Sequence, residues 1–97
     1  MTDAPAATRI DIWLWRARFF RTRSLSAKTA AGGLRINGRR TDKPGAAVRV
    51  GDVLTFVQAG RVRVIEILDL GERRGPATEA QALYRDRDHA RTGAPET

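Results

Sequence analysis

The sequence contains no cysteine, and His89 is the only histidine among its 97 residues. The absence of cysteine excludes disulfides, thiolate metal sites and a cysteine nucleophile. One histidine in a polar segment offers neither a zinc site nor a Ser-His-Asp triad. We therefore predict that the protein holds no metal and no cofactor and is not an enzyme.

Long apolar runs are absent as well, because no run approaches the ~18 residues that a membrane-spanning helix needs. Residues 1–5 lack the basic and apolar regions of a signal peptide. These two absences predict a cytoplasmic protein that makes no membrane contact. A chain of 97 residues has room for one domain, whose small core cannot also enclose a deep substrate pocket.

Lysine is scarce, since Lys28 and Lys43 are the only two among 18 basic residues and the other 16 are arginines. Residues 9–43 hold ten basic residues and two acidic ones, a net charge of +8, whereas residues 44–97 hold eight of each. The net charge of the whole chain is +7, because Asp3 precedes both segments. An arginine surplus confined to one segment indicates a surface that binds nucleic-acid phosphates.

Apolar residues at helical spacing predict a first helix from Arg9 to Phe20. Its core stripe consists of Ile10, Trp13, Leu14, Ala17 and Phe20. A second stripe, which contains Trp15 and Phe19, is expected to pack under a C-terminal helix near Tyr84. Stacking of these two rings on RNA bases is the alternative.

The next segment predicts a second helix and a β-hairpin. Thr22 or Ser24 is the expected N-cap of a short helix that ends at the two glycines at 32–33. The Asn-Gly pair at 37–38 predicts a two-residue turn in a hairpin that spans 34–41.

The later part of the chain predicts further strands and a last helix. The strands are expected at 48–50, 53–57 and 61–69. In the last of these strands the alternation of apolar and polar residues shifts by one position at residues 64–65. This shift indicates a bulge or burial on both faces. Pro76 is expected to begin a helix that runs through Tyr84. The element order predicts an α+β fold in which two N-terminal helices pack on a small, bent antiparallel sheet, with a short C-terminal helix alongside.

Several short motifs occur in an order and spacing that resemble one family. They are Arg9-Ile10-Asp11-x-Trp13-Leu14, Thr22-Arg23-Ser24, Gly33-x-Arg35-Ile36-Asn37-Gly38, Lys43-Pro44 and Val48-x-Val50-Gly51-Asp52-x-Leu54. Over about residues 9–56 the chain resembles the S4 domain, an RNA-binding module named after small-subunit ribosomal protein S4. The resemblance implies the alpha-L RNA-binding motif as the fold and structured RNA as the partner.

Two longer segments resemble the heat shock protein 15 family, a bacterial, ribosome-associated group of S4-domain proteins. They are Trp13-Leu14-Trp15-x-Ala17-Arg18-Phe19-Phe20-x-Thr22-Arg23 and Arg74-Gly75-Pro76-Ala77-x-Glu79-Ala80-x-x-Leu83-Tyr84. This resemblance implies binding to rRNA of the large ribosomal subunit, including subunits that hold a stalled peptidyl-tRNA. The chain departs from the family at residues 28–33, which are one residue short. It also stops soon after Tyr84, where some members carry a longer basic extension.

The predicted RNA-binding surface combines the start of the second helix, the hairpin and the loop after it. Its residues are Arg9, Arg21, Arg23, Ser24, Lys28, Arg35, Asn37, Arg39, Arg40 and Lys43. Arginines with acidic neighbours are expected in local ion pairs instead, and these are Arg61, Arg63, Arg73, Arg74, Arg85 and Arg87. The expected organisation is a monomer with a disordered tail at 1–8, an S4-type RNA-binding domain at 9–70, a C-terminal loop and helix at 71–87, and a disordered tail at 88–97.

Three alternatives stay open on the sequence alone. S4 domains also occur in RNA-modifying enzymes, so the chain could be the RNA-docking module of such a system. A basic surface also fits DNA, which predicts equal affinity for duplex DNA and structured RNA at matched salt. The stripe that contains Trp15 and Phe19 could instead bind a protein, with an affinity insensitive to salt.

Overall fold

The computed structural model describes residues 6–87, so residues 1–5 of the tail expected at 1–8, and the whole tail expected at 88–97, lie outside the described residues. The elements, in chain order, are β1 (Thr8–Arg9), α1 (Ile10–Arg16), α2 (Arg23–Ala31), β2 (Leu34–Ile36), β3 (Arg39–Thr41), β4 (Ala47–Val48), β5 (Val53–Gln58), β6 (Arg61–Ile67), α3 (Ala77–Gln81) and β7 (Tyr84–Asp86). Thr8 pairs with Val48, so regular pairing begins one residue before the predicted domain boundary at Arg9.

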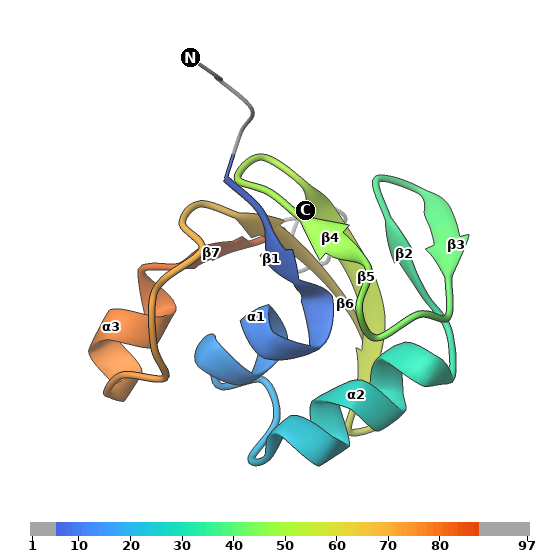
Figure 1. Cartoon of the computed structure of the whole chain (residues 1–97), viewed down its shortest axis with the longest axis horizontal. Coiled ribbons are helices and arrows are strands. Elements are labelled where there is room, and N and C mark those ends of the chain that lie inside the picture. The colour runs from blue at the N-terminus through green and yellow to red at the C-terminus, as the bar shows by residue number, and fades with distance from the viewer. Residues whose placement is uncertain (1–5, 88–97) are drawn as a thin grey trace, which may run out of the picture.

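Five strands form one antiparallel sheet in the order β3-β2-β5-β6-β7, and β1 pairs with β4 in a separate two-stranded sheet. Helices α1 and α2 lie on one face of the large sheet, and α3 lies on the other side of α1 from α2 (Figure 1). The core between these layers combines Trp13 and Leu14 of α1 with Leu54 and Ile65 of the sheet, all of them fully buried. The predicted α+β class is confirmed.

Helix α1 is shorter than predicted, because it ends at Arg16 and does not reach Phe20. Arg18 adopts a left-handed backbone conformation with a φ of 65°, and the N–H of Phe19 donates to the carbonyl of Leu14. This pattern is a helix-ending Schellman motif, usually built on glycine. Its consequence is that the chain reverses and Phe19 turns into the core, where its side chain is 7% exposed.

The ring of Phe19 lies 4.6 Å from the ring of Tyr84 and 5.3 Å from that of Phe56, measured between centroids. Packing of Phe19 against the C-terminal segment is therefore confirmed. The last helix is wrong in extent, since α3 ends at Gln81 and Tyr84 belongs to strand β7. Pairing of Tyr84 with Ile67 extends the sheet, so backbone hydrogen bonds across strands replace those of a longer helix.

Thr22 is the N-cap of α2, because its side chain accepts a hydrogen bond from the backbone N–H of Leu25. The other candidate, Ser24, lies within the first turn of the helix. The hairpin turn is confirmed by positive φ angles of 53° at Asn37 and 85° at Gly38, which a two-residue turn of this kind requires.

Pairing of β5 with β6 runs without interruption from Val53–Glu66 to Gln58–Arg61, so the bulge predicted at residues 64–65 is wrong. Burial on both faces is wrong as well, because Ile65 faces the core while Val62 is 59% exposed. The alternation shifts because the apolar residues of β6 lie on its outer face at one end of the strand and on its core face at the other end.

Candidate nucleic-acid interface

A groove of about 510 Å³ lies between the hairpin and the segment around β4, and three arginines line it. Arg39 and Arg40 come from β3, whereas Arg49 follows β4. The backbone N–H of Arg49 donates to the carboxylate of Asp52 over 2.9 Å, which closes a tight turn and places Arg49 beside the hairpin. Arg49 lies outside the predicted basic segment, and only its position next to a Gly-Asp turn could have indicated it.

Asn37 joins the hairpin to this turn through both ends of its amide. Its side-chain oxygen accepts the backbone N–H of Val53 over 2.8 Å, and its Nδ2 donates to Oδ1 of Asp52 over 3.0 Å. The amide therefore sets the separation of the two walls of the groove. A direct contact of Asn37 with RNA stays a prediction, and the contacts described here give it a positioning role.

Arg35 and Arg40 stand opposite each other on neighbouring strands of the hairpin. Like charges in directly opposite positions destabilise a sheet, which favours a functional reason for both. Arg35 donates to the carbonyl of Gly38 over 3.0 Å, and the guanidinium of Arg40 lies against the backbone of Gly33. A Cβ atom at Gly33 would come within 2.5 Å of Nη2 of Arg40, so this placement of Arg40 requires glycine.

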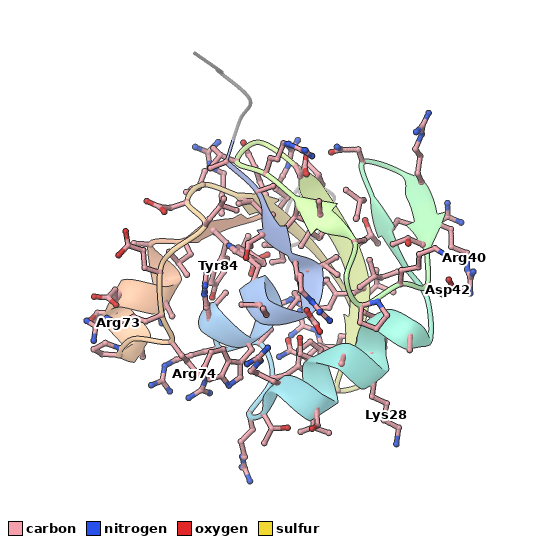
Figure 2. The ribbon with its side chains drawn as sticks, viewed as in Figure 1. Lys28, Arg40, Asp42, Arg73, Arg74 and Tyr84 are labelled. Carbon is pink, nitrogen blue, oxygen red and sulfur yellow. The ribbon has the colours of Figure 1, made fainter. Side chains whose placement is uncertain are left out.

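Helix α2 connects this hairpin to a second group of cations. Its nine residues span about 13 Å, with Arg21 and Arg23 at the start and the hairpin beyond the end. Lys28 lies between the start of α2 and the hairpin, and its side chain points away from the body of the protein (Figure 2). Arg40 lies near the far end of the helix (Figure 2). The start of α2 adds the positive end of the helix dipole. Arg21, Arg23, Ser24 and Lys28 are all exposed.

Arg9 differs from the other predicted cations because, within residues 6–87, it alone among them forms an ion pair with a carboxylate. Its guanidinium makes two hydrogen bonds with the buried Asp11, at 2.9 and 3.1 Å, and this contact raises the pKa of Arg9 above its ordinary value. The side chain lies against Gly45, in the loop that follows Lys43. Arg9 and Lys43 therefore border the same loop, and any RNA contact of Arg9 competes with Asp11.

Four arginines of the second half of the chain form the predicted ion pairs. Arg63 contacts Asp86 and Arg73 contacts Glu79, whereas Arg85 and Arg87 both lie near Glu66; the N–O distances are 3.0, 3.1, 3.6 and 3.7 Å respectively. The prediction is wrong for Arg74, which has no carboxylate partner among residues 6–87. Arg74 instead donates to the backbone carbonyl of Trp15 and lies over its ring, because the loop after β6 folds back onto the end of α1.

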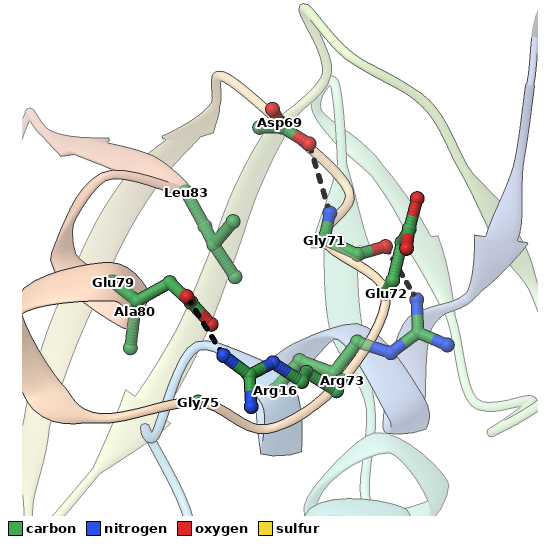
Figure 3. Close-up of a pocket in the computed structure, with 9 residues that line it drawn as sticks. All are labelled: Arg16, Asp69, Gly71, Glu72, Arg73, Gly75, Glu79, Ala80 and Leu83. Carbon is green, nitrogen blue, oxygen red and sulfur yellow. Dashed lines mark hydrogen bonds and ion pairs between the residues drawn. The ribbon is translucent and has the colours of Figure 1, made fainter.

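A second hollow, of about 300 Å³, lies between this loop and α3 (Figure 3). Both of its arginines are engaged: Arg16 donates to the carbonyl of Gly71, and Arg73 pairs with Glu79. Over the described residues, no cluster of three or more histidine, cysteine, aspartate or glutamate side chains offers a metal site. Within residues 6–87, no helix has both the length and the apolarity needed to cross a membrane.

Comparison with known proteins agrees with this architecture. The S4 domain family matches residues 8–54. Heat shock protein 15 of Escherichia coli strain K12 is 39% identical over 88 residues, and its homolog in Aeromonas salmonicida is 41% identical over 85 residues. These matches cover 89% and 87% of this chain, which spans 65% and 64% of the length of the two relatives.

A solved structure of Vibrio cholerae heat shock protein 15, described as trimeric, is 33% identical, with a TM-score of 0.76. The match covers 95% of this chain and all of that one. The fold and the basic surface thus define a small α+β protein built on the S4 domain, the RNA-binding module recognised in the motifs above. More particularly, the chain belongs to the heat shock protein 15 family.

Proposed function

We propose that this chain binds structured RNA through the surface that runs from the start of α2 to the hairpin and the loop after it. The observation that carries the proposal is the difference in ion pairing between two sets of arginines. On the proposed surface, Arg21, Arg23, Arg39 and Arg40 have no carboxylate partner within residues 6–87, whereas four arginines of the second half are paired. Cations left without internal partners are available to phosphates.

Binding by this surface is mainly electrostatic. Arginine forks fit phosphate oxygens in a bidentate manner, and the groove beside the hairpin is lined by three of them. Each phosphate that is neutralised releases counterions, so affinity falls steeply as salt rises. We expect recognition of RNA shape with few base-specific contacts, because Asn37, the one amide at the hairpin turn, is held by Val53 and Asp52.

The RNA that we propose is rRNA of the large ribosomal subunit, including subunits that carry a stalled peptidyl-tRNA. Membership of the heat shock protein 15 family supports this partner, because the family is associated with ribosomes. On the same ground we propose that the protein acts in the cytoplasm. We further propose that the chain acts alone as a monomer, without cofactor and without catalytic activity. Light scattering at several protein concentrations measures the oligomeric state, and a trimer would contradict the monomer.

Co-sedimentation with separated large and small ribosomal subunits, across a series of salt concentrations, tests the proposal. The variant Arg21/Arg23/Arg39→Glu reverses three charges of the surface and should no longer sediment with the large subunit. A matched variant, Arg73/Arg85/Arg87→Glu, makes the same change of charge among the paired arginines and should still sediment. Equal sedimentation of the first variant and the wild type would show that the proposed surface is wrong.

The same preparation separates this function from its rivals. Duplex DNA that competes as well as structured RNA at matched salt would favour a general nucleic-acid-binding protein. Base modification of the bound RNA would favour a role in an RNA-modifying system. Binding to the subunit that does not weaken with salt would favour contacts with a ribosomal protein.

A further inference from the structure

Two guanidinium groups lie over the ring of Trp15. The Cζ atom of Arg23 lies 5.8 Å from the centroid of the indole, and that of Arg74 lies 5.9 Å from it. Arg23 begins α2, whereas Arg74 lies in the loop between β6 and α3. Neither guanidinium has a carboxylate partner among residues 6–87. Two cations therefore meet at one aromatic ring, although they are 51 positions apart in the sequence.

The loop that carries Arg74 is fastened to the end of α1 by several hydrogen bonds. Trp13 donates to the carbonyl of Asp69 over 2.9 Å, Arg16 to that of Gly71 over 3.0 Å, and Arg18 to that of Gly75 over 2.6 Å. Arg74 itself donates through Nε to the carbonyl of Trp15 over 3.1 Å. This arrangement holds the guanidinium in place before any ligand arrives, which reduces the entropy lost on binding.

A guanidinium stacked on a ring gives up part of its solvation on one side but keeps its in-plane N–H donors. Arg74 has one of these donors bonded to Trp15, which leaves its terminal nitrogens available for another acceptor. Two such forks beside one ring suit an oxyanion that can accept from both. A phosphate is the oxyanion of this kind that RNA supplies, and Arg21 and the start of α2 extend the positive surface next to it.

We propose that Arg23, Trp15 and Arg74 form a phosphate clamp that binds one backbone phosphate of the RNA. The clamp extends the interface beyond residues 8–54, which match the S4 domain, onto the C-terminal segment of the chain. This inference rests on the proposed function, since it assumes that the neighbouring surface binds RNA. It gives the loop at 70–75 a role in binding in addition to its role in covering the end of α1.

The test measures the affinity of the full chain for a fluorescently labelled RNA stem-loop across a salt series. Arg74→Gln should weaken binding about tenfold and lower the slope of log affinity against log salt by about 1. Arg73→Gln is the matched control, because it removes the same charge one residue away from a side chain already paired with Glu79. Equal affinities and slopes for the two variants would overturn the clamp.

Arg23→Gln gives a second measurement that does not disturb the loop at 70–75. Within residues 6–87 the Arg23 side chain makes no hydrogen bond that the substitution would remove. If both arginines grip one phosphate, the double variant Arg23/Arg74→Gln should lose less than the product of the two single losses. Strictly multiplicative losses would overturn a shared phosphate. Thermal melting of each variant checks that the protein is folded at the temperature of the assay.

Two further arms separate the possible sources of failure. Because Trp13 is fully buried, a change of tryptophan fluorescence on adding RNA reports Trp15, and inorganic phosphate at the same phosphate concentration should leave it unchanged. An equal change with inorganic phosphate would show that the site around Trp15 binds a free anion and not an RNA phosphate. If the wild type fails to bind the stem-loop, the proposed function fails. If Arg39/Arg40→Gln loses affinity but Arg74→Gln does not, only the clamp fails.

Discussion

The arginines of this protein fall into two regions that differ in their surroundings. Around α2 and the hairpin, Arg21, Arg23, Arg39 and Arg40 are exposed and have no carboxylate partner within residues 6–87. Along β6, β7 and α3, arginines face carboxylates at 3.0 to 3.7 Å. The two regions contain the same residue type within one small domain. The number of arginines therefore does not identify a binding surface, because the position of the acidic residues decides which cations remain available.

Arg35 and Arg40 strengthen this contrast. They stand opposite each other on paired strands, where like charges repel. In the other region the neighbouring strands place Arg85 opposite Glu66, which is attractive. The pairing of Arg35 with Arg40 does not contribute to the stability of the sheet. An anionic partner removes the repulsion when it binds, so the cost in the free protein becomes a contribution to affinity.

The largest expected effect comes from two charge-matched double variants. Arg39/Arg40→Gln should weaken binding to an RNA stem-loop about a hundredfold, because two charge-assisted hydrogen bonds are lost. Arg85/Arg87→Gln removes the same charge and should weaken it less than about threefold, since both side chains lie beside Glu66. Fluorescence anisotropy at fixed salt measures both. Equal losses would mean that only the total charge matters.

A second comparison uses two glycines with positive φ. Gly33→Ala forces alanine to a φ of 105° and displaces the guanidinium of Arg40, so it should destabilise the fold by about 1–3 kcal/mol and also weaken RNA binding. Gly60→Ala has a φ of 79° and no atom within 4 Å of the added methyl group, so only stability should fall. Denaturant unfolding and RNA titration separate the two. Unchanged RNA affinity in folded Gly33→Ala would remove Arg40 from the interface.

The third variant asks whether Asn37 serves the turn or the RNA. Asn37→Ala loses two hydrogen bonds and places alanine at a φ of 53°, which together should cost about 1–2 kcal/mol of stability. Asn37→Gly loses the same bonds without the conformational cost. If the amide only positions the groove, both variants should weaken RNA binding to a similar, small extent well below their melting temperatures. A large loss of affinity in both would establish the direct contact.

The smallest expected effect concerns the pair of Arg73 and Glu79, whose side chains are 69% and 49% exposed. A double-mutant cycle with Arg73→Gln and Glu79→Gln should give a coupling of about 0.2–1 kcal/mol in unfolding free energy. RNA affinity should not change in Arg73→Gln. A clear loss of affinity there would show that paired arginines also bind RNA, and the contrast between the two regions would not hold.

Local patterns predicted the elements whose hydrogen bonds are local. The cap at Thr22, the end of α2 at the paired glycines and the Asn-Gly hairpin each depend on a few neighbouring residues, and the structure contains all three. Helical periodicity failed after Arg16 because it cannot distinguish a continuing helix from a chain that reverses and buries Phe19 from the other side. Pro76 likewise marked the start of α3 and left its end undefined, since that end depends on the pairing of β7 with β6.

The candidate site shows the same division. Most of its cations were predicted as one segment, because the surplus of charge is a property of composition and needs no structure. Arg49 and Arg74 were missed, because a tight turn brings the first to the hairpin and a folded-back loop brings the second to Trp15. Arg9 was included, although the structure pairs it with Asp11 two residues away.

The amino-acid sequence was enough to predict an unbalanced arginine-rich segment, one small α+β domain and the motifs of the S4 domain. Those properties follow from composition and from contacts between residues close in the chain. The folded chain was needed to show which arginines have no carboxylate partner within residues 6–87 and which distant arginines lie beside them. The reason is physical: an ion pair or a stacked ring depends on a few ångströms of separation, and those separations are set by the path of the folded chain.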